Sequence, residues 1–131
     1  FLSDLIRSIK NPSRVDFKRV SSYGSAMKSK GEITITKDLE EDIEGKNVII
    51  VEDIIDSGLT LKVIKEMLIK RRPKTLKICA LLDKKACRVV DMEGDYVGLA
   101  IDDGFVVGYG IDYAEYYRNL PNICIVEEDS L

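Results

Sequence analysis

Residues 48–61 read VIIVEDIIDSGLTL, and this stretch decides the fold. Its first four residues are a continuous apolar run, which is typical of a strand covered on both faces of a parallel sheet. Residues 59–70 place apolar side chains at helical spacing ahead of Pro73, and residues 76–82 predict another buried strand. A strand, a helix and a strand within about 35 residues form a βαβ unit with a right-handed crossover.

The same stretch carries side chains that predict a functional site. Two carboxylates, Glu52 and Asp53, follow the apolar run. Burying a charge costs free energy, so carboxylates at the end of a buried strand are expected to serve a function. Ligands of open α/β sheets bind just beyond the carboxyl ends of strands. The turn 56–60 then opens a helix, so its N–H groups, its hydroxyls and the helix dipole favour a phosphate. The alternative is that Ser57 or Asp56 simply caps the helix, since the turn lacks the Gly-Lys-Ser/Thr ending of a P-loop.

On the N-terminal side, residues 1–11 predict a helix that ends before Pro12. Residues 15–20 and 33–35 predict short strands, and residues 21–31 predict a mobile loop between them. The chain begins on a phenylalanine rather than a methionine, within a helical pattern that has no cap. We therefore expect it to be a piece of a longer protein.

On the C-terminal side, short strands are predicted over residues 96–101, 106–107 and 123–126. No repeat, low-complexity tract or linker interrupts the chain. A chain of 131 residues buries enough surface for one hydrophobic core. The sequence therefore predicts a single α/β domain over residues 1–131.

The composition excludes several classes of function. With 20 basic and 23 acidic side chains the net charge is −3, which argues against a protein built mainly to grip nucleic acid. No apolar stretch is long enough to cross a membrane. The chain has no histidine, so catalysis that depends on histidine is excluded. Its three cysteines (Cys79, Cys87 and Cys124) are expected to be buried thiols in a reducing compartment, which predicts the cytoplasm.

Residues 51–60 (VEDIIDSGLT) resemble the phosphoribosyl pyrophosphate motif of the type I phosphoribosyltransferases, and of the hypoxanthine-guanine phosphoribosyltransferases in particular. Four further segments match this family in order: 21–24 (SSYG), 81–84 (LLDK), 105–110 (FVVGYG) and 112–121 (DYAEYYRNLP). The resemblance implies a type I phosphoribosyltransferase fold, which is a mainly parallel sheet flanked by helices with a small hood of short strands.

The resemblance also implies roles for the residues of the central stretch. Glu52 and Asp53 are implied to hold the ribose 2- and 3-hydroxyls, directly or through Mg²⁺. Asp56 is implied to be the general acid–base group beside the purine imidazole nitrogen. The 5-phosphate is implied to lie against Asp56, Ser57, Gly58, Leu59 and Thr60.

Base recognition is implied to come from the later segments. Lys84 corresponds to the group that hydrogen-bonds the 6-oxo oxygen and so selects hypoxanthine or guanine over adenine. Phe105 corresponds to the residue that stacks on the purine, and Val106 to the one that meets its edge through the backbone.

The remaining matches concern pyrophosphate and metal. Asp112 is implied to ligate Mg²⁺ and Arg118 to contact the pyrophosphate, while Ser22 and Tyr23 belong to a loop that closes over the reaction. Taken singly, Lys84 suits a solvated loop charge, Asp112 a turn residue and Arg118 a surface charge of a helix. As an ordered set behind the phosphate motif they favour the functional interpretation.

The activity implied is purine salvage: hypoxanthine, and guanine, react with phosphoribosyl pyrophosphate to give the nucleoside monophosphate and pyrophosphate, with Mg²⁺ as cofactor. The family also implies a homodimer or homotetramer, with no nucleic-acid or membrane partner. Two alternatives are a nucleic-acid-binding regulator of related fold and an inactive nucleotide-binding remnant. In the family a strand and a pyrophosphate loop precede the first helix, and that strand lies between strands 15–20 and 48–51, so we expect such a segment ahead of Phe1.

Overall fold

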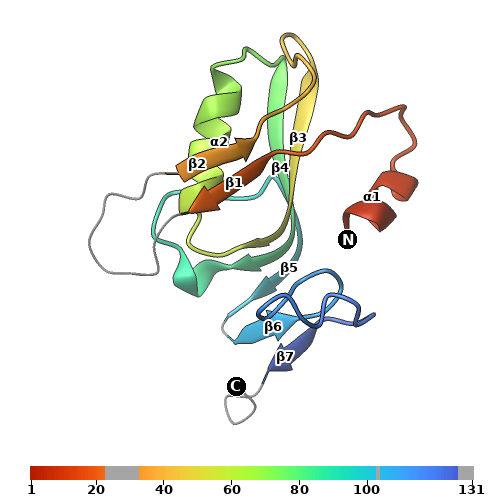
Figure 1. Ribbon diagram of the computed structural model, residues 1–131, viewed down its shortest axis with the longest axis vertical. Helices are drawn as coiled ribbons and strands as arrows, with labels where there is room; N and C mark the ends of the chain where they lie inside the picture. The colour runs from red at the N-terminus through yellow and green to blue at the C-terminus, as the bar shows by residue number, and fades with distance from the viewer. Residues whose placement is uncertain (23–32, 103, 127–131) are drawn as a thin grey trace.

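The computed structural model describes residues 1–22, 33–102 and 104–126. Its centre is a parallel sheet of three strands in the order β3–β4–β5 (Figure 1). The elements of this unit are β3 (Asn47–Ile55), α2 (Leu59–Ile69), β4 (Thr75–Lys84), the 3₁₀ turn η1 (Lys85–Cys87) and β5 (Tyr96–Ile101). The predicted βαβ unit is therefore confirmed, with β3 and β4 both longer than their apolar runs.

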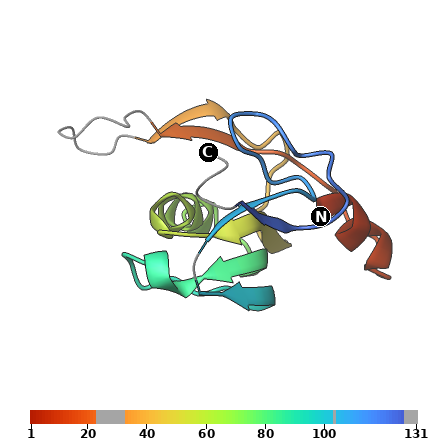
Figure 2. The same ribbon diagram turned by 90° about the horizontal axis from the view of Figure 1, so that it is seen from below.

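The main core lies between α2 and one face of this sheet. Leu61, Ile64 and Leu68 of α2 are buried against Ile50 and Ile78 of the strands. The short helix α1 (Leu2–Ser8) lies on the opposite side of the sheet, and it has no buried residue (Figure 2).

The expectation that residues 48–51 are covered on both faces is wrong for the part of the chain that the structure describes. Ile49 is 49% exposed, on the face opposite to α2. An open groove runs along this face between α1, residues 12–18 and β3. The physical reason is that α1 and residues 12–18 line this groove without filling it, so part of the apolar face of β3 stays open.

Two antiparallel hairpins flank the central unit. One pairs β1 (Arg19–Ser22) with β2 (Ile33–Lys37), and the other pairs β6 (Phe105–Val107) with β7 (Cys124–Val126). Val106 of β6 packs with Leu82 and Ile111 in a second, smaller core near the carboxyl ends of β3 and β4. This contact brings the hood of short strands to the edge of the sheet where ligands are expected.

The N-terminal boundaries differ from the sequence predictions. Helix α1 ends at Ser8, because Ile9 is already extended, three residues before Pro12. Residues 15–18 are outside any strand, and β1 instead includes Ser21 and Ser22, which were predicted as loop. β1 pairs with β2 alone and does not join the parallel sheet. The rest of the predicted loop lies outside the described residues.

The described helices include none that is both long and apolar enough to cross a membrane. The cysteines are free thiols: Cys79 and Cys87 are half-buried and Cys124 is exposed. The expectation of three buried cysteines is therefore wrong, most clearly for Cys124. The physical reason is that Cys124 lies at the start of β7, a strand with no fully buried residue that belongs to a two-stranded hairpin.

Candidate active site

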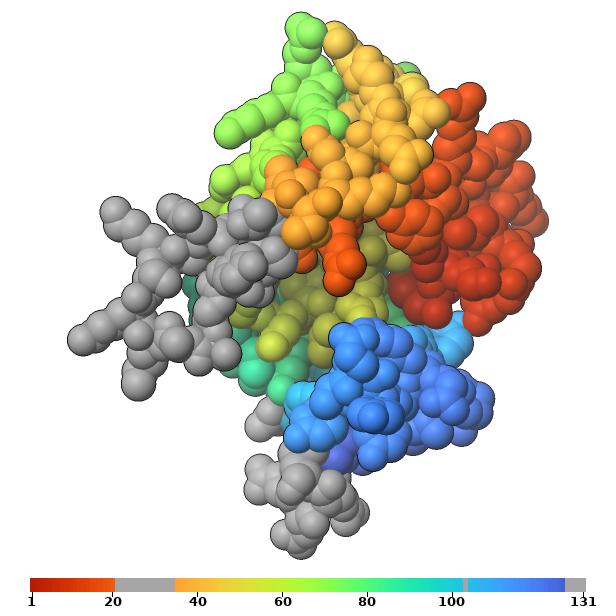
Figure 3. All heavy atoms as spheres, in the orientation of Figure 1, coloured from red at the N-terminus to blue at the C-terminus, as the bar shows by residue number. Residues whose placement is uncertain are grey.

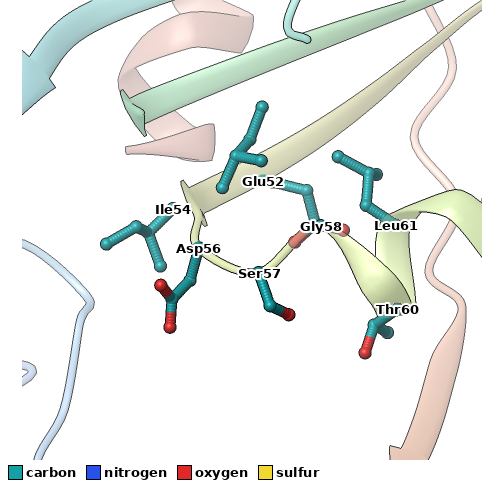
Figure 4. A pocket seen from close by; sticks show the side chains of 8 residues that line it. Glu52, Ile54, Asp56, Ser57, Gly58, Thr60 and Leu61 are labelled. Atoms are coloured by element: carbon teal, nitrogen blue, oxygen red, sulfur yellow. The ribbon is translucent and has the colours of Figure 1, made fainter. Parts of the chain in front are cut away.

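The turn between β3 and α2 forms a pocket of about 160 Å³. Figure 4 shows the side chains of Asp56, Ser57 and Thr60 on one side of this turn, with Glu52 reaching toward it from the strand. The first hydrogen bond of α2 runs from Lys62 N to Gly58 O at 2.9 Å, and the N–H groups before it have no partner within the helix. The turn is therefore suited to bind an anion through its backbone.

The capping alternative for this turn is wrong. The residue at the N-cap of α2 is Gly58, which has no side chain to form a capping bond, so neither Ser57 nor Asp56 occupies that position. Gly58 has φ +81°, a left-handed conformation that glycine adopts without strain. The Ser57 hydroxyl accepts a long 3.4 Å bond from Leu59 N. Asp56 is exposed and free of any role as a helix cap.

Glu52 and Asp53 lie within β3 rather than beyond its end, because the strand continues to Ile55. Successive side chains of a strand point to opposite faces, so the two carboxylates diverge. Glu52 is half-buried in the pocket, and Asp53 is exposed. Burial raises the pKa of Glu52 to about 7, and the charge of the neighbouring Asp53 adds to the rise.

This raised pKa predicts a pH-dependent stability. The unfolded chain releases the Glu52 proton near the ordinary value of 4.5, whereas the folded chain holds it up to about pH 7. The free energy of unfolding therefore falls as pH rises through this window and levels off above it. In metal-free buffer we expect Glu52→Gln to match the wild type at pH 4.5 and to exceed its stability by about 1–2 kcal/mol at pH 8.

Urea unfolding at several pH values measures this difference. Glu66→Gln, at an exposed position of α2, is the matched control and should follow the wild type at every pH. An equal offset between Glu52→Gln and the wild type at pH 4.5 and pH 8 would contradict the assignment.

Asp56 and Lys84 come together around a third side chain. The pKa of the Cys87 thiol is raised, chiefly by its interaction with the Asp56 carboxylate, and the neighbouring Lys84 opposes this rise. Lys84 is the last residue of β4, not a loop residue, and its ammonium donates to Gly104 O at 3.0 Å. Because Gly104 precedes Phe105, this bond links Lys84 to the strand that carries the predicted stacking residue.

The predicted stacking residue has an aromatic support. Phe105 is 43% exposed and meets Tyr113 edge to face, with ring centroids 5.3 Å apart. Its neighbour Val106 is 7% exposed and packs into the second core, which fixes the strand on which Phe105 stands. An exposed ring face on a rigid strand is suited to stack on a flat heterocycle.

Asp112 and Arg118 lie together in the loop between β6 and β7. Arg118 Nη2 and Asp112 Oδ1 are 2.8 Å apart, and Arg118 Nη1 donates to Gly110 O at 3.0 Å. Among the described residues no three carboxylate or thiol side chains gather into a metal-binding group. Asp112 is therefore not brought together with Glu52 and Asp53 in one cluster.

The closing-loop residues are described only in part. Ser22 is the last residue of β1, and Tyr23 lies outside the described residues. In the space-filling view, atoms of β3 and of the turn after it lie at the centre of one face, between the N-terminal segment and the β6–β7 region (Figure 3). The turn after β3 and the β6–β7 region thus lie on the same face of the molecule (Figure 3).

Sequence reasoning missed Cys87, Asp83 and Arg88. Asp83 is 2% exposed and pairs with Arg88 beneath the turn. A charge directly after the apolar residues of β4 was the available signal, the same one that drew attention to Glu52. No comparable signal marks Arg88, because only the fold brings residues 83 and 88 under residues 55–57.

Comparisons with known proteins agree with this geometry. Residues 1–114 match the phosphoribosyl transferase domain. The hypoxanthine-guanine phosphoribosyltransferase of Aquifex aeolicus is 52% identical over 98% of this chain and 72% of that protein. The hypoxanthine phosphoribosyltransferase of Salmonella typhimurium is 55% identical over 94% of the chain and 69% of that protein.

A solved structure gives the same answer for the fold. The hypoxanthine phosphoribosyltransferase of Staphylococcus aureus superposes with a TM-score of 0.92 at 49% identity, over 98% of this chain and 70% of that one. The parallel sheet and the antiparallel hairpins described above agree with this likeness. The chain therefore belongs to the phosphoribosyltransferase family, in its group of hypoxanthine and hypoxanthine-guanine phosphoribosyltransferases.

Proposed function

We propose that this protein transfers the phosphoribosyl group of phosphoribosyl pyrophosphate to hypoxanthine, and to guanine, giving the nucleoside monophosphate and pyrophosphate. The observation that carries the proposal is that one series of contacts joins the turn of residues 56–60 to the strand that carries Phe105. The turn of residues 56–60 offers a phosphate cradle, and Asp56 at its mouth contacts Cys87, which also meets Lys84. Lys84 reaches the base side through Gly104.

The reaction needs charge stabilisation at the anomeric carbon. Displacement of pyrophosphate develops positive charge on the ribose ring, and nearby carboxylates stabilise it. Glu52 and Asp53 are proposed to hold the ribose hydroxyls. Asp56 is proposed to take the proton from the imidazole nitrogen of the base as the new bond forms, since the chain has no histidine to do so.

Recognition of the base is proposed to rest on two side chains. The Lys84 ammonium is a donor only, so it favours the 6-oxo oxygen of hypoxanthine or guanine and disfavours the 6-amino group of adenine. Phe105 is proposed to stack on the ring, and the backbone of Val106 to meet the purine edge. Arg118 is proposed to contact the pyrophosphate, and Ser22 and Tyr23 to belong to the segment that closes over the substrates.

Magnesium is the proposed cofactor. Its preferred ligands are carboxylate and phosphate oxygens. Glu52, Asp53 and Asp112 are the candidate carboxylates, and because the described residues do not gather them into one cluster, each would hold an ion together with phosphate oxygens of the substrate rather than with the other two. When bound, the ion would neutralise the charge of the leaving pyrophosphate. Activity is expected to fall to background in excess chelator and to return when Mg²⁺ is added back. Full activity in excess chelator would contradict the proposal.

A coupled assay tests the function directly. Purified protein with Mg²⁺, phosphoribosyl pyrophosphate and hypoxanthine should form inosine monophosphate and pyrophosphate in equal amounts, with adenine as the negative control. Failure to form either product would contradict the proposal.

We also propose that residues 1–131 form a single catalytic domain and that the protein assembles as a homodimer or homotetramer. A cytoplasmic location is proposed as well, in keeping with the free thiols.

A further inference from the structure

The guanidinium of Arg88 lies buried beneath the phosphate turn. Its Nε donates to Asp56 O at 2.9 Å and its Nη2 to Ile55 O at 3.3 Å, while Nη1 donates to Met92 O. Nη2 also pairs with the carboxylate of Asp83. The two side chains are 13% and 3% exposed, so the pair is almost completely enclosed.

These bonds fix the direction of the backbone in the turn. Val89 N donates to Ser57 O at 3.1 Å, so residues 88 and 89 hold three successive carbonyl oxygens, those of Ile55, Asp56 and Ser57. In a planar trans peptide the C=O and the next N–H point in opposite directions. The N–H groups of residues 57 and 58 must therefore point away from Arg88. Successive N–H groups aimed to one side form a concavity that binds anions.

Packing of the 88–92 segment against the back of the turn supports the same view. A Cβ added at Gly58 would lie 3.0 Å from Val90 Cγ2, 3.1 Å from Arg88 Cδ and 3.2 Å from Met92 Cβ. The pocket on the other side is lined by residues 52–61 and by none of the 88–92 segment. The turn is thus held between a backing segment and an open pocket.

We infer that Arg88 is a positioning residue for phosphoribosyl transfer: its guanidinium, neutralised by Asp83, holds the carbonyls of Ile55 and Asp56 so that the turn presents its N–H groups to the 5-phosphate. The same contact orients Asp56, whose carboxylate acts on the base. This inference rests on the proposed function and adds to it a residue outside the pocket.

The alternative is that the pair serves only to stabilise the fold. A buried ion pair is weak evidence for stability, because apolar side chains of similar volume replace such pairs without loss in many proteins. An apolar replacement cannot donate to the carbonyls of the turn. A variant with apolar side chains at both positions should therefore keep the stability of the fold and lose substrate binding.

Two variants provide this separation. Arg88→Lys keeps a cation beside Asp83 but loses the fork of donors, and the double variant Asp83→Leu with Arg88→Met replaces the pair with apolar groups. Both are expected to unfold cooperatively within a few degrees of the wild type. For both, KM for phosphoribosyl pyrophosphate should rise and kcat should fall, with kcat/KM lower by about a hundredfold, the typical cost of a small misplacement of reacting groups. KM for hypoxanthine should change less.

Val90→Ala is the matched control, because it removes packing from the back of the turn without removing a donor. It should keep kcat and both KM values near those of the wild type. Wild-type values of kcat and KM in either Arg88 variant would overturn the inference. So would an equal loss of kcat/KM in Val90→Ala, or unfolding of both Arg88 variants. Each of these outcomes would leave Arg88 with a structural role.

Calorimetric titration with phosphoribosyl pyrophosphate and Mg²⁺, in the absence of base, separates this inference from the proposed function. Tight binding to the wild type and weak binding to Arg88→Lys would support the positioning role even if no base were converted. If the wild type and Arg88→Lys bound phosphoribosyl pyrophosphate equally and both converted hypoxanthine, the positioning role would be overturned. The proposed function would remain intact.

Discussion

Asp56→Asn is expected to lower hypoxanthine turnover by about 10²- to 10⁴-fold, the usual contribution of a general acid–base group. Asparagine keeps the size of the side chain but cannot accept the proton. The melting temperature should change little, because Asp56 is exposed and the cap of α2 is Gly58. KM for phosphoribosyl pyrophosphate should also stay close to that of the wild type, since the backbone of the turn, rather than the Asp56 carboxylate, is proposed to bind the phosphate.

Steady-state kinetics over a range of pH measures this effect. The loss should appear in kcat for hypoxanthine at every pH at which the wild type is active, because asparagine cannot accept the proton. Asp91→Asn, at an exposed position of the backing segment, is the matched control and should behave as the wild type. Near-normal turnover in Asp56→Asn would remove Asp56 from the proposed mechanism.

Lys84→Ala is expected to reduce kcat/KM for hypoxanthine by about 10- to 150-fold, since the loss of a hydrogen bond to a charged group costs about 1.5–3 kcal/mol. The discrimination against adenine should collapse at the same time, because a lone donor no longer faces the amino group. General damage to the site would lower the rates for both bases equally. The ratio of the two kcat/KM values is therefore the decisive measurement.

Two further variants complete this test. Lys85→Ala removes the neighbouring exposed lysine and should leave both the rate and the ratio unchanged. Lys84→Arg keeps a donor at the position and should retain more of the discrimination than Lys84→Ala. An unchanged ratio in Lys84→Ala would mean that the bond from Lys84 to Gly104 O serves only to hold the strand ends together.

Local patterns were sufficient to predict the central βαβ unit. The apolar run of residues 48–51 and the helical spacing of 59–70 are strong periodic signals, and the structure places β3 and α2 where they indicated. The boundaries were less accurate, since strands continue for as long as a neighbour pairs with them. β3 pairs with β4 up to Ile55, and Lys84 at the end of β4 pairs with Ile101 of β5, so pairing draws both Glu52 and Lys84 into the strands.

The N-terminal part was predicted less well for a physical reason. Residues 15–18 alternate apolar and charged side chains, yet the described structure pairs β1 with β2 from Arg19 onward. Alternation indicates which residues suit a half-buried strand, but hydrogen-bonded pairing depends on a partner that is distant in sequence.

The sequence by itself determined the fold class, the position of the turn between β3 and α2, and the family, because each depends on local patterns and on their order along the chain. Only the tertiary structure decided which groups support the turn. Arg88 and Asp83 are separated from residues 55–57 by more than twenty positions, and they reach the turn because parallel pairing sets Asp83 opposite Ile55. Periodicity and spacing carry no information about such a contact, since it arises from the register of two strands and the path of the segment that follows them.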